Sequence, residues 1–387
     1  MAYPKVILVH FGELWLRGKN RPSYIAVLRH NIIRQLNGER FKLYYKYDRF
    51  LIEPDADEDL EKIVGKLSHV FGISRIAVAE GAAPELGAIV SAASKAIEAL
   101  SAGDAKRLRI VSHRSYKNLP FDSNDIVKSL SEVARSSGLI PVNKGYDTTL
   151  FVNVTKESAY IYDNNLAGQR GLPVGSSGKC IVLFSGGIDS PVAAWFAMKR
   201  GLIPVYLHVH PSLKQEGLKE TKIHRLTEML SEYYPGYKAY YIPAHIFQAA
   251  ATKAEKRYEG VLFKAFLFRL AEKIAKKEGA KIMVTGESIG QVASQTIDNI
   301  AASQYGIKMP VVMPLSGFDK EEIISVARTI GTYEESIKPY RDVCAMGANK
   351  PATTTGIDRM KKMLKDISMG DVVRRSMKLA YVVEKEA

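Results

Sequence analysis

The hydrophobic pattern of the chain changes near residue 165, and the second part has the more regular pattern. From residue 179 onward, short runs of mostly apolar residues alternate with longer stretches of helical periodicity. Apolar runs without alternating polar residues are typical of a parallel sheet that helices cover on both faces. We therefore predict strands at 180–184, 203–209, 239–243, 281–285 and 310–314, and helices at 190–200, within 217–234, and at 249–278, 290–302 and 319–330.

The first part mixes helices and strands without that alternation. Residues 164–179 follow it and contain four glycines and a proline among polar residues, a composition that marks a junction between domains. The pattern thus indicates an α+β region followed by an α/β region. In the α+β region we predict strands at 5–11, 107–114, 148–154 and 159–162, and helices at 24–36, 58–70, 88–101 and 123–137.

The net charge of the chain indicates a polyanionic partner. Its 387 residues include 55 Lys and Arg against 41 Asp and Glu, and the formal net charge of +14 favours nucleic acid or an anionic membrane as partner. No apolar run reaches the roughly 20 residues of a membrane helix, and the first ten residues do not read as a signal peptide. Because Cys180 and Cys344 are the only cysteines, we expect no disulfide framework and a reducing, cytoplasmic setting.

The first candidate site is Ser185-Gly186-Gly187-Ile188-Asp189-Ser190, which joins an apolar strand to a helix. Two glycines let main-chain N–H groups approach an anion and adopt positive φ at little cost, and the N-terminus of the helix attracts the same anion. Ser185 and Ser190 can donate hydrogen bonds, and Asp189 could hold a Mg²⁺ ion that bridges phosphates. The alternative is a plain strand–turn–helix corner in which Asp189 caps the helix.

A second candidate site, T-G-E-S-I-G-Q-V-A-S-Q at 285–295, also follows an apolar strand. Its glycines, Gly286 and Gly290, permit close approach. The polar side chains that can read a base, ribose or phosphate are Gln291, Ser294 and Gln295. A capped amphipathic helix is the alternative for this stretch.

The loop at 185–190 resembles the pyrophosphate loop of the N-type ATP pyrophosphatases. Together with 285–295, 309–323 and 332–346, and with G-E-L-W-L-R-G-K-N-R (12–21) and G-L-P-V-G (171–175), it closely resembles the tRNA 4-thiouridine synthetase family. The resemblance implies an α/β fold with a C-terminal parallel-sheet PP-loop domain (adenine nucleotide α-hydrolase-like), preceded by α+β ferredoxin-like and THUMP domains. The implied boundaries are 1–58 for the ferredoxin-like domain, 59–166 for the THUMP RNA-binding domain, 167–178 for a linker and 179–387 for the catalytic domain.

The resemblance implies that ATP, with Mg²⁺, adenylates uridine 8 of tRNA and that sulfur replaces O4 to give 4-thiouridine. Its catalytic residues would be Cys344, which handles the sulfur, and Asp189. A buried free cysteine is the alternative for Cys344, whereas Cys180 lies in an apolar strand and is expected in the core. Cys344 has no neighbouring cysteine, and a rhodanese-like domain is not expected. The sulfur donor would therefore be a separate persulfide carrier such as a cysteine desulfurase, or sulfide.

Nucleotide contacts are implied by the same resemblance. His208 could equally be a histidine that is satisfied at the end of its strand, and either Lys264 or Arg269 could supply the cation for phosphate. The implied ATP-binding residues are Leu183, Phe184, Ser185, Gly186, Gly187, Asp189, Ser190, His208, Val209, Lys264, Gly286 and Gln295.

Contacts with tRNA are expected from cations spread over the chain, although a solvated strand face is the alternative for each of them. The basic stretches 360–365 and 372–378 could bind RNA or pack on the core as amphipathic helices. The oligomeric state, with a homodimer as one option, and a role in thiamine biosynthesis stay open. So do two rival functions, another PP-loop adenylating enzyme and a non-catalytic RNA-binding protein with a retained nucleotide fold. The candidate RNA-binding residues are Arg17, Lys19, Arg21, Arg107, Arg109, Arg114 and Lys117.

Overall fold

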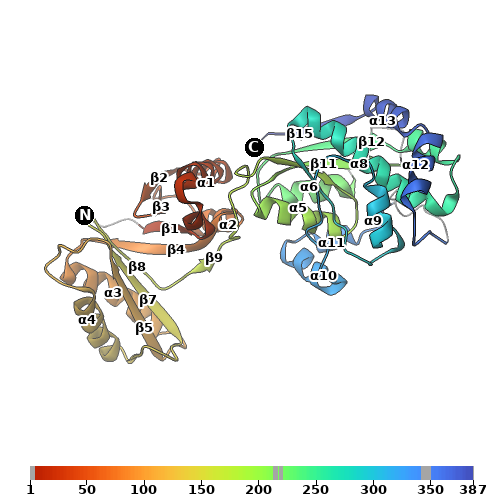
Figure 1. Ribbon diagram of the computed structural model, residues 1–387. Coiled ribbons are helices and arrows are strands. Elements are labelled where there is room, and N and C mark those ends of the chain that lie inside the picture. Colours follow the sequence, from red (N-terminus) through yellow and green to blue (C-terminus); the bar gives the residue numbers. More distant parts are fainter. Residues whose placement is uncertain (1–4, 212–216, 218–220, 341–349, 387) are drawn as a thin grey trace. The chain divides into compact units, whose positions relative to one another are not determined.

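The computed structural model describes residues 5–211, 217, 221–340 and 350–386, and the chain forms two compact units (Figure 1). The N-terminal unit comprises Met1–Arg17 and Gln35–Arg170, and the C-terminal unit comprises Gly18–Arg34 and Gly171–Ala387. Each unit is described by itself below.

The described part of the N-terminal unit contains one nine-stranded sheet of order β2-β3-β1-β4-β8-β7-β5-β6, with β9 paired to β4. Its pairs are antiparallel except that β5 runs parallel to β6 and β7. The sheet combines strands from both sides of residues 58 and 59, so the division into 1–58 and 59–166 stays a prediction. The strands are β1 (Lys5–Phe11), β2 (Phe41–Lys46), β3 (Arg49–Pro54), β4 (Ile73–Ala82), β5 (Arg107–Arg114), β6 (Ile140–Pro141), β7 (Thr148–Val154), β8 (Ala159–Tyr162) and β9 (Leu166–Ala167).

The helices of this unit are α2 (Leu60–Ser68), α3 (Leu86–Ser101) and α4 (Ser123–Ser136), close to the predicted ranges. Helices α3 and α4 pack on β5, β7 and β8 through Ile97, Leu130 and Val152, which are fully buried. Helix α4 begins with a capping box between Asp122 and Asp125, which satisfies N–H groups that the first turn leaves without helical partners. The four strands predicted in this part of the chain are confirmed.

The C-terminal unit contains, among its described residues, a six-stranded sheet of order β14-β13-β10-β11-β12-β15. The five strands other than β15 are parallel, as predicted, and β15 runs antiparallel to β12 at the edge. The strands are β10 (Lys179–Leu183), β11 (Ile203–His210), β12 (Tyr237–Pro243), β13 (Ile282–Val284), β14 (Val311–Val312) and β15 (Tyr381–Lys385).

Helices cover both faces of this sheet (Figure 1). On one face, Phe266 and Leu270 of α8 (Glu259–Glu278) pack against Ile181 and Val205, together with α7 (His245–Ala251) and α13 (Met369–Lys378). Helix α5 (Asp189–Lys199) contacts β10, β11 and β13 and also meets α6 (Lys222–Leu230) and α10 (Lys320–Thr329). The predicted α/β architecture is confirmed.

Two predicted helices of this unit are wrong in extent. The stretch 249–278 is divided into α7, a short 3₁₀ turn η3 (Lys256–Tyr258) and α8. The stretch 290–302 is a loop with one 3₁₀ turn, η4 (Ala293–Gln295), before α9 (Ile297–Ser303). Both differences place loop residues beside the cavity described below.

The basic C-terminal stretches form α12 (Ile357–Asp366) and α13. Met360 and Val372 are buried in the core of the unit, whereas Lys362, Arg374 and Arg375 are exposed. These helices are therefore packed on the core, and their cations face solvent. None of the helices that the structure describes combines the length and apolar character that a membrane span requires.

Helix α1 (Arg21–Gln35) joins the C-terminal unit although it lies near the start of the chain. Asn31 Nδ2 donates to the main-chain O of Val174 at 2.9 Å, and Arg34 Nη1 donates to the hydroxyl of Tyr234 at 2.8 Å. The segment that contains Val174 is itself close-packed, because a Cβ atom at Gly171 would lie 2.2 Å from the Lys199 carbonyl oxygen. The predicted linker therefore contains residues that pack tightly on the C-terminal unit.

Candidate functional site

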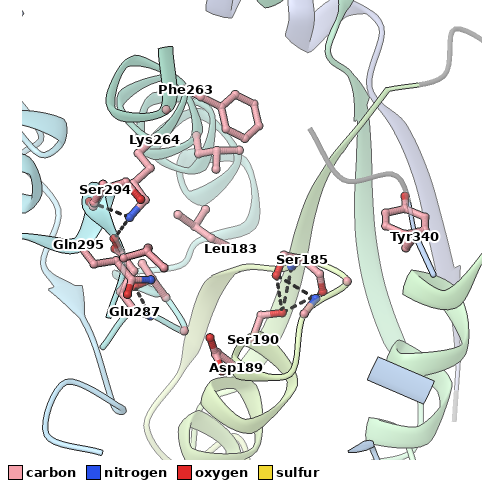
Figure 2. A pocket seen from close by; sticks show the side chains of 18 of the residues that line it. Leu183, Ser185, Asp189, Ser190, Phe263, Lys264, Glu287, Ser294, Gln295 and Tyr340 are labelled. Carbon is pink, nitrogen blue, oxygen red and sulfur yellow. Dashed lines mark hydrogen bonds and ion pairs between the residues drawn. The ribbon is translucent and has the colours of Figure 1, made fainter. Parts of the chain in front are cut away.

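A cavity of about 720 Å³ lies in the C-terminal unit, where β10 and β13 end. Such a place, beyond the carboxyl ends of parallel strands, is where α/β proteins bind their ligands. Figure 2 shows Lys264, Glu287 and Gln295 on one side, the 185–190 loop at the strand end, and Tyr340 on the other side. The lining residues that the sequence predicted are Leu183, Ser185, Gly186, Gly187, Asp189, Ser190, Lys264, Gly286, Ser294 and Gln295.

The 185–190 loop is fixed by its two serines. Ser185 N donates to Ser190 Oγ at 3.0 Å, and this hydroxyl donates back to the main-chain O of Ser185 at 2.9 Å. Ser190 is buried, so its hydroxyl shapes the loop, while Ser185 Oγ accepts from Gly187 N at 3.3 Å. The closed loop stands before the first turn of α5, whose N-terminus favours an anion.

Gly186 and Gly286 serve close approach, whereas Gly290 has positive φ and no atom within 4 Å of its would-be Cβ, so the close approach predicted there is wrong. Neither Gly186 nor Gly187 has positive φ, which corrects one reason for expecting glycine there. A Cβ atom at Gly186 would lie 2.9 Å from Lys222 Cε and 3.0 Å from Tyr340 Cδ1. A Cβ atom at Gly286 would lie 2.8 Å from Asp189 C and from Ser190 N. The two candidate loops therefore touch through their main chains.

Asp189 is not a helix cap. The residue before the helix is Ile188, and no side chain caps the helix there. The Asp189 carboxylate accepts from Lys320 Nζ at 2.5 Å and from Gln291 Nε2 at 3.3 Å. It therefore lies at the cavity edge with a cation beside it.

Lys264 is the predicted cation that reaches the cavity. Its Nζ bonds to Glu287 Oε1 and donates to the main-chain O of Ser294 at 3.0 Å. Glu287, which is buried, also accepts from Thr285 Oγ1 at 3.0 Å. Arg269 instead donates to the main-chain O of Ala265 and Tyr305, and burial lowers the pKa of its guanidinium. The structure thus separates a cavity cation, Lys264, from a structural one.

Gln295 brings an unsatisfied polar atom to the cavity. Its Oε1 is buried and has no hydrogen-bond partner among the described residues. A buried carbonyl oxygen without a donor costs free energy, so the arrangement suits a ligand that supplies an N–H or O–H group.

Phe184, His208 and Val209 line a smaller cavity of about 50 Å³, which shares Leu183 and Ser185 with the large one. His208 is buried, with Nδ1 2.9 Å from the Phe184 carbonyl oxygen and Nε2 2.9 Å from the Tyr340 hydroxyl. Protein groups therefore satisfy both ring nitrogens, as the strand-end alternative expected.

Several lining residues were not predicted from the sequence. Arg257 borders the cavity from η3, and Lys222, Lys338 and Tyr340 border it next to the 185–190 loop, called the phosphate loop below. Among the described lining residues, four cations (Lys222, Arg257, Lys264 and Lys338) stand against two acids (Asp189 and Glu287). That excess suits a polyphosphate, and the signal available in the sequence was only the basic composition.

A magnesium ion would find one available carboxylate here. Within the described residues no group of three or more His, Cys, Asp or Glu side chains could hold a metal. Mg²⁺ is often bound by one or two carboxylates plus substrate phosphates. Both acids are ion-paired, but Glu287 is buried against Lys264, whereas the partner of Asp189 is Lys320, which is 43% exposed. Asp189 therefore fits a magnesium ion that arrives with a nucleotide.

The two cysteines differ in what the structure describes. Cys180 is fully buried in β10, and burial raises the pKa of its thiol to about 12, which agrees with the core role predicted for it. Cys344 lies outside the described residues.

The candidate RNA-binding cations lie in both units. Arg107 pairs with Asp147 at 3.0 Å, and hydrogen bonds from Arg107 lower the pKa of that carboxyl to about 2. Arg109 lies over the Tyr146 ring, and Arg114 donates to the main-chain O of Phe121. Arg17 pairs with Glu13, and the exposed candidates are Lys19, Arg107 and Lys117, while Arg21 is half-buried.

The parallel sheet, the glycine loop before a helix N-terminus and the basic cavity define a nucleotide-binding α/β protein. A profile described as "Thiamine biosynthesis protein (ThiI)" matches residues 175–369, and one described as "ThiI ferredoxin-like domain" matches residues 6–77. The chain belongs to the ThiI family of tRNA sulfurtransferases. The family predicted from the sequence motifs is thereby confirmed.

Relatives and solved structures agree with this membership. The chain is 34% identical to a "Probable tRNA sulfurtransferase" of Thermoanaerobacter pseudethanolicus, over 92% of this chain and 93% of the relative. It is 33% identical to one of Staphylococcus aureus, over 98% and 94%. A crystal structure of a "4-thiouridine synthetase - RNA complex with bound ATP" is similar, with 31% identity, a TM-score of 0.90, and coverage of 99% of this chain and 100% of that chain.

Proposed function

We propose that this protein uses ATP to adenylate O4 of uridine 8 in tRNA and then replaces that oxygen with sulfur, giving 4-thiouridine. One observation carries the proposal. The phosphate loop and the residues that lead toward Cys344, namely Ser336, Lys338 and Tyr340, line the same cavity. Family membership supports the reaction, and the similar structure with RNA and ATP supports the two substrates.

In the first step, O4 of the uracil attacks the α-phosphorus of ATP, and the bond to the β-phosphate oxygen breaks. The N-terminus of α5 and Lys264 would stabilise the phosphate charge, and Gln295 Oε1 would accept a hydrogen bond from the nucleotide. Asp189 would hold a magnesium ion, which supplies charge neutralisation on the phosphates.

In the second step, sulfide or the outer sulfur of a Cys344 persulfide attacks C4, and AMP leaves with the former O4. In the persulfide case a reducing thiol then cleaves the S–S bond, which releases 4-thiouridine and returns Cys344 to the thiol. Adenylation is needed because a free carbonyl oxygen is a poor leaving group. We assign the handling of sulfur to Cys344, since a thiolate is nucleophilic and a persulfide has a weak S–S bond. The donor would be a persulfide carrier or sulfide, and the protein would act in the cytoplasm, as a homodimer or a single chain.

Binding of tRNA would use exposed cations of both units, including Lys19 and Lys117, and the division into ferredoxin-like and THUMP domains is part of this proposal. Exposed cations on α12 and α13, such as Lys362 and Arg375, add basic surface to the C-terminal unit.

The test is incubation of the protein with unmodified tRNA, ATP, Mg²⁺ and either sulfide or a charged persulfide donor, followed by mass spectrometry of the nucleosides. We expect 4-thiouridine from the wild type and from Cys180→Ala, and a loss of at least 100-fold for Cys344→Ala with the persulfide donor. Thiolation that persists in Cys344→Ala would show that the sulfur role is wrong. Absence of pyrophosphate release in the wild type would favour a non-catalytic RNA-binding protein.

A further inference from the structure

Residues 336–340, which precede Cys344 in the sequence, are tied to the phosphate loop by side chains from two other elements. Lys222, in the first turn of α6, donates from Nζ to the main-chain O of Ser336 at 2.8 Å and of Lys338 at 2.7 Å. Tyr340 places its hydroxyl 2.9 Å from Nε2 of His208, at the end of β11. One short segment is therefore held at three points.

The His208 contact leads directly to the phosphate loop. Its Nδ1 is 2.9 Å from the main-chain O of Phe184, and a carbonyl oxygen can only accept a hydrogen bond. Nδ1 therefore carries a proton, and in the neutral form of the ring Nε2 accepts from the Tyr340 hydroxyl. Because Phe184 immediately precedes Ser185, two hydrogen bonds connect Tyr340 to the start of the loop.

The same two side chains also touch the loop itself. A Cβ atom at Gly186 would lie 2.9 Å from Lys222 Cε and 3.0 Å from Tyr340 Cδ1, so both pack against the Cα of this glycine. Lys222 Nζ lies 5.8 Å from the centre of the Tyr340 ring, within cation–π range. The anchor of the segment and the phosphate loop are thus one packed assembly.

We propose that Lys222, His208 and Tyr340 are positioning residues that hold the chain leading to Cys344 against the phosphate loop. This proposal rests on the sulfur-handling role proposed for Cys344. Cys344 lies four positions after Tyr340, and an extended chain spans at most about 3.6 Å per residue, so the chain itself limits their Cα separation to about 14 Å. Holding the thiol near the adenylated base raises its effective concentration at C4, which accelerates the second step.

The first test separates the two steps. In Lys222→Met and Tyr340→Phe, the amount of 4-thiouridine formed per pyrophosphate released should fall at least fivefold. These substitutions should misplace the Cys344 thiol, which slows sulfur transfer, more than they disturb the groups that carry out adenylation. Lys222→Arg keeps a donor and should recover most of the ratio. Tyr237→Phe is the matched control, since Tyr237 also contacts a histidine, His224, but does not line the cavity. An unchanged ratio in both Lys222→Met and Tyr340→Phe would overturn the proposal.

The second test does not depend on the sulfur chemistry. Cys180 is buried, so the rate of reaction with an aromatic disulfide reagent reports Cys344. Tyr340→Phe should change this rate at least threefold, and Tyr237→Phe should not. A changed rate together with normal thiolation by Cys344→Ala would support the positioning and refute the proposed sulfur role. Equal rates in wild type and Tyr340→Phe would contradict the positioning.

Discussion

Gly286 is the place where one added methyl group should disturb the cavity most. Its Cβ would meet main-chain atoms of Asp189 and Ser190 at 2.8 Å, whereas ordinary contacts begin at 3.4 Å. Main-chain atoms cannot rotate away, so the two loops must separate by about 0.6 Å, and overpacking of this kind costs about 1–3 kcal/mol. A cost of about 1.4 kcal/mol changes a binding constant about tenfold, so we expect Gly286→Ala to weaken ATP binding about tenfold.

The control is Gly260→Ala, which adds the same methyl group to the same cavity. Gly260 lies in α8 and has no atom within 4 Å of its would-be Cβ. Alanine in a helix is more stable than glycine by about 0.5–1 kcal/mol, so this variant should gain stability.

The assay uses the two tryptophans of the chain, one in each unit. In a Trp15→Phe background, the fluorescence of buried Trp195 in α5 reports urea unfolding of the C-terminal unit, and calorimetry reports ATP binding. If Gly286→Ala unfolds at the same urea concentration as its parent and binds ATP equally well, the close approach of the two loops has no energetic role.

Other predictions concern charged and titrating groups. Lys264→Met should cost about 3–5 kcal/mol in urea unfolding because it leaves Glu287 buried without its cation; adding Glu287→Gln should restore stability but not ATP binding, and equal stability of both variants would contradict this. Asp189→Asn should change stability by less than about 1 kcal/mol, since its partner Lys320 is 43% exposed, yet abolish pyrophosphate release; retained release would refute a role in ATP chemistry. Burial, followed by the charges of two neighbouring histidines, lowers the pKa of His210 to about 4. The unfolded chain then binds more protons below about pH 6.5, so stability should fall from there toward pH 4; His210→Gln should flatten this slope, and an unchanged slope would count against it.

The sequence predicted the buried strands of the parallel sheet well because their signal is local, whereas β3 and β4, which are also largely buried, were not predicted. Apolar runs such as 180–184 need no knowledge of distant residues. Strand β2 gave no such signal, since most of its residues are exposed and two of its six residues are lysines. It forms through pairing with β3, which is a long-range property.

The predicted helix at 249–278 failed for a related reason. Ala, Lys and Glu in this stretch all favour helix, and no proline interrupts it. In the structure, the first helix of this stretch, α7, ends before Arg257, and the main-chain O of Arg257 accepts from Ala352 N at 2.9 Å. A contact across about 95 residues, which local propensity does not contain, accompanies the break that brings Arg257 to the cavity.

The glycine loops show how a correct residue can be predicted for an incomplete reason. Positive φ was one reason to expect glycine there, yet none of Gly186, Gly187 and Gly286 has positive φ. The structure supplies crowding instead, and only at Gly186 and Gly286, because a Cβ at Gly187 would meet nothing closer than 3.5 Å. The two causes make opposite predictions for asparagine, which tolerates positive φ but adds more volume than alanine. If crowding is the cause, Gly187→Asn should be tolerated in ATP binding, while Gly286→Asn should be worse than Gly286→Ala. The reverse order would indicate that backbone conformation, rather than crowding, requires glycine at these positions.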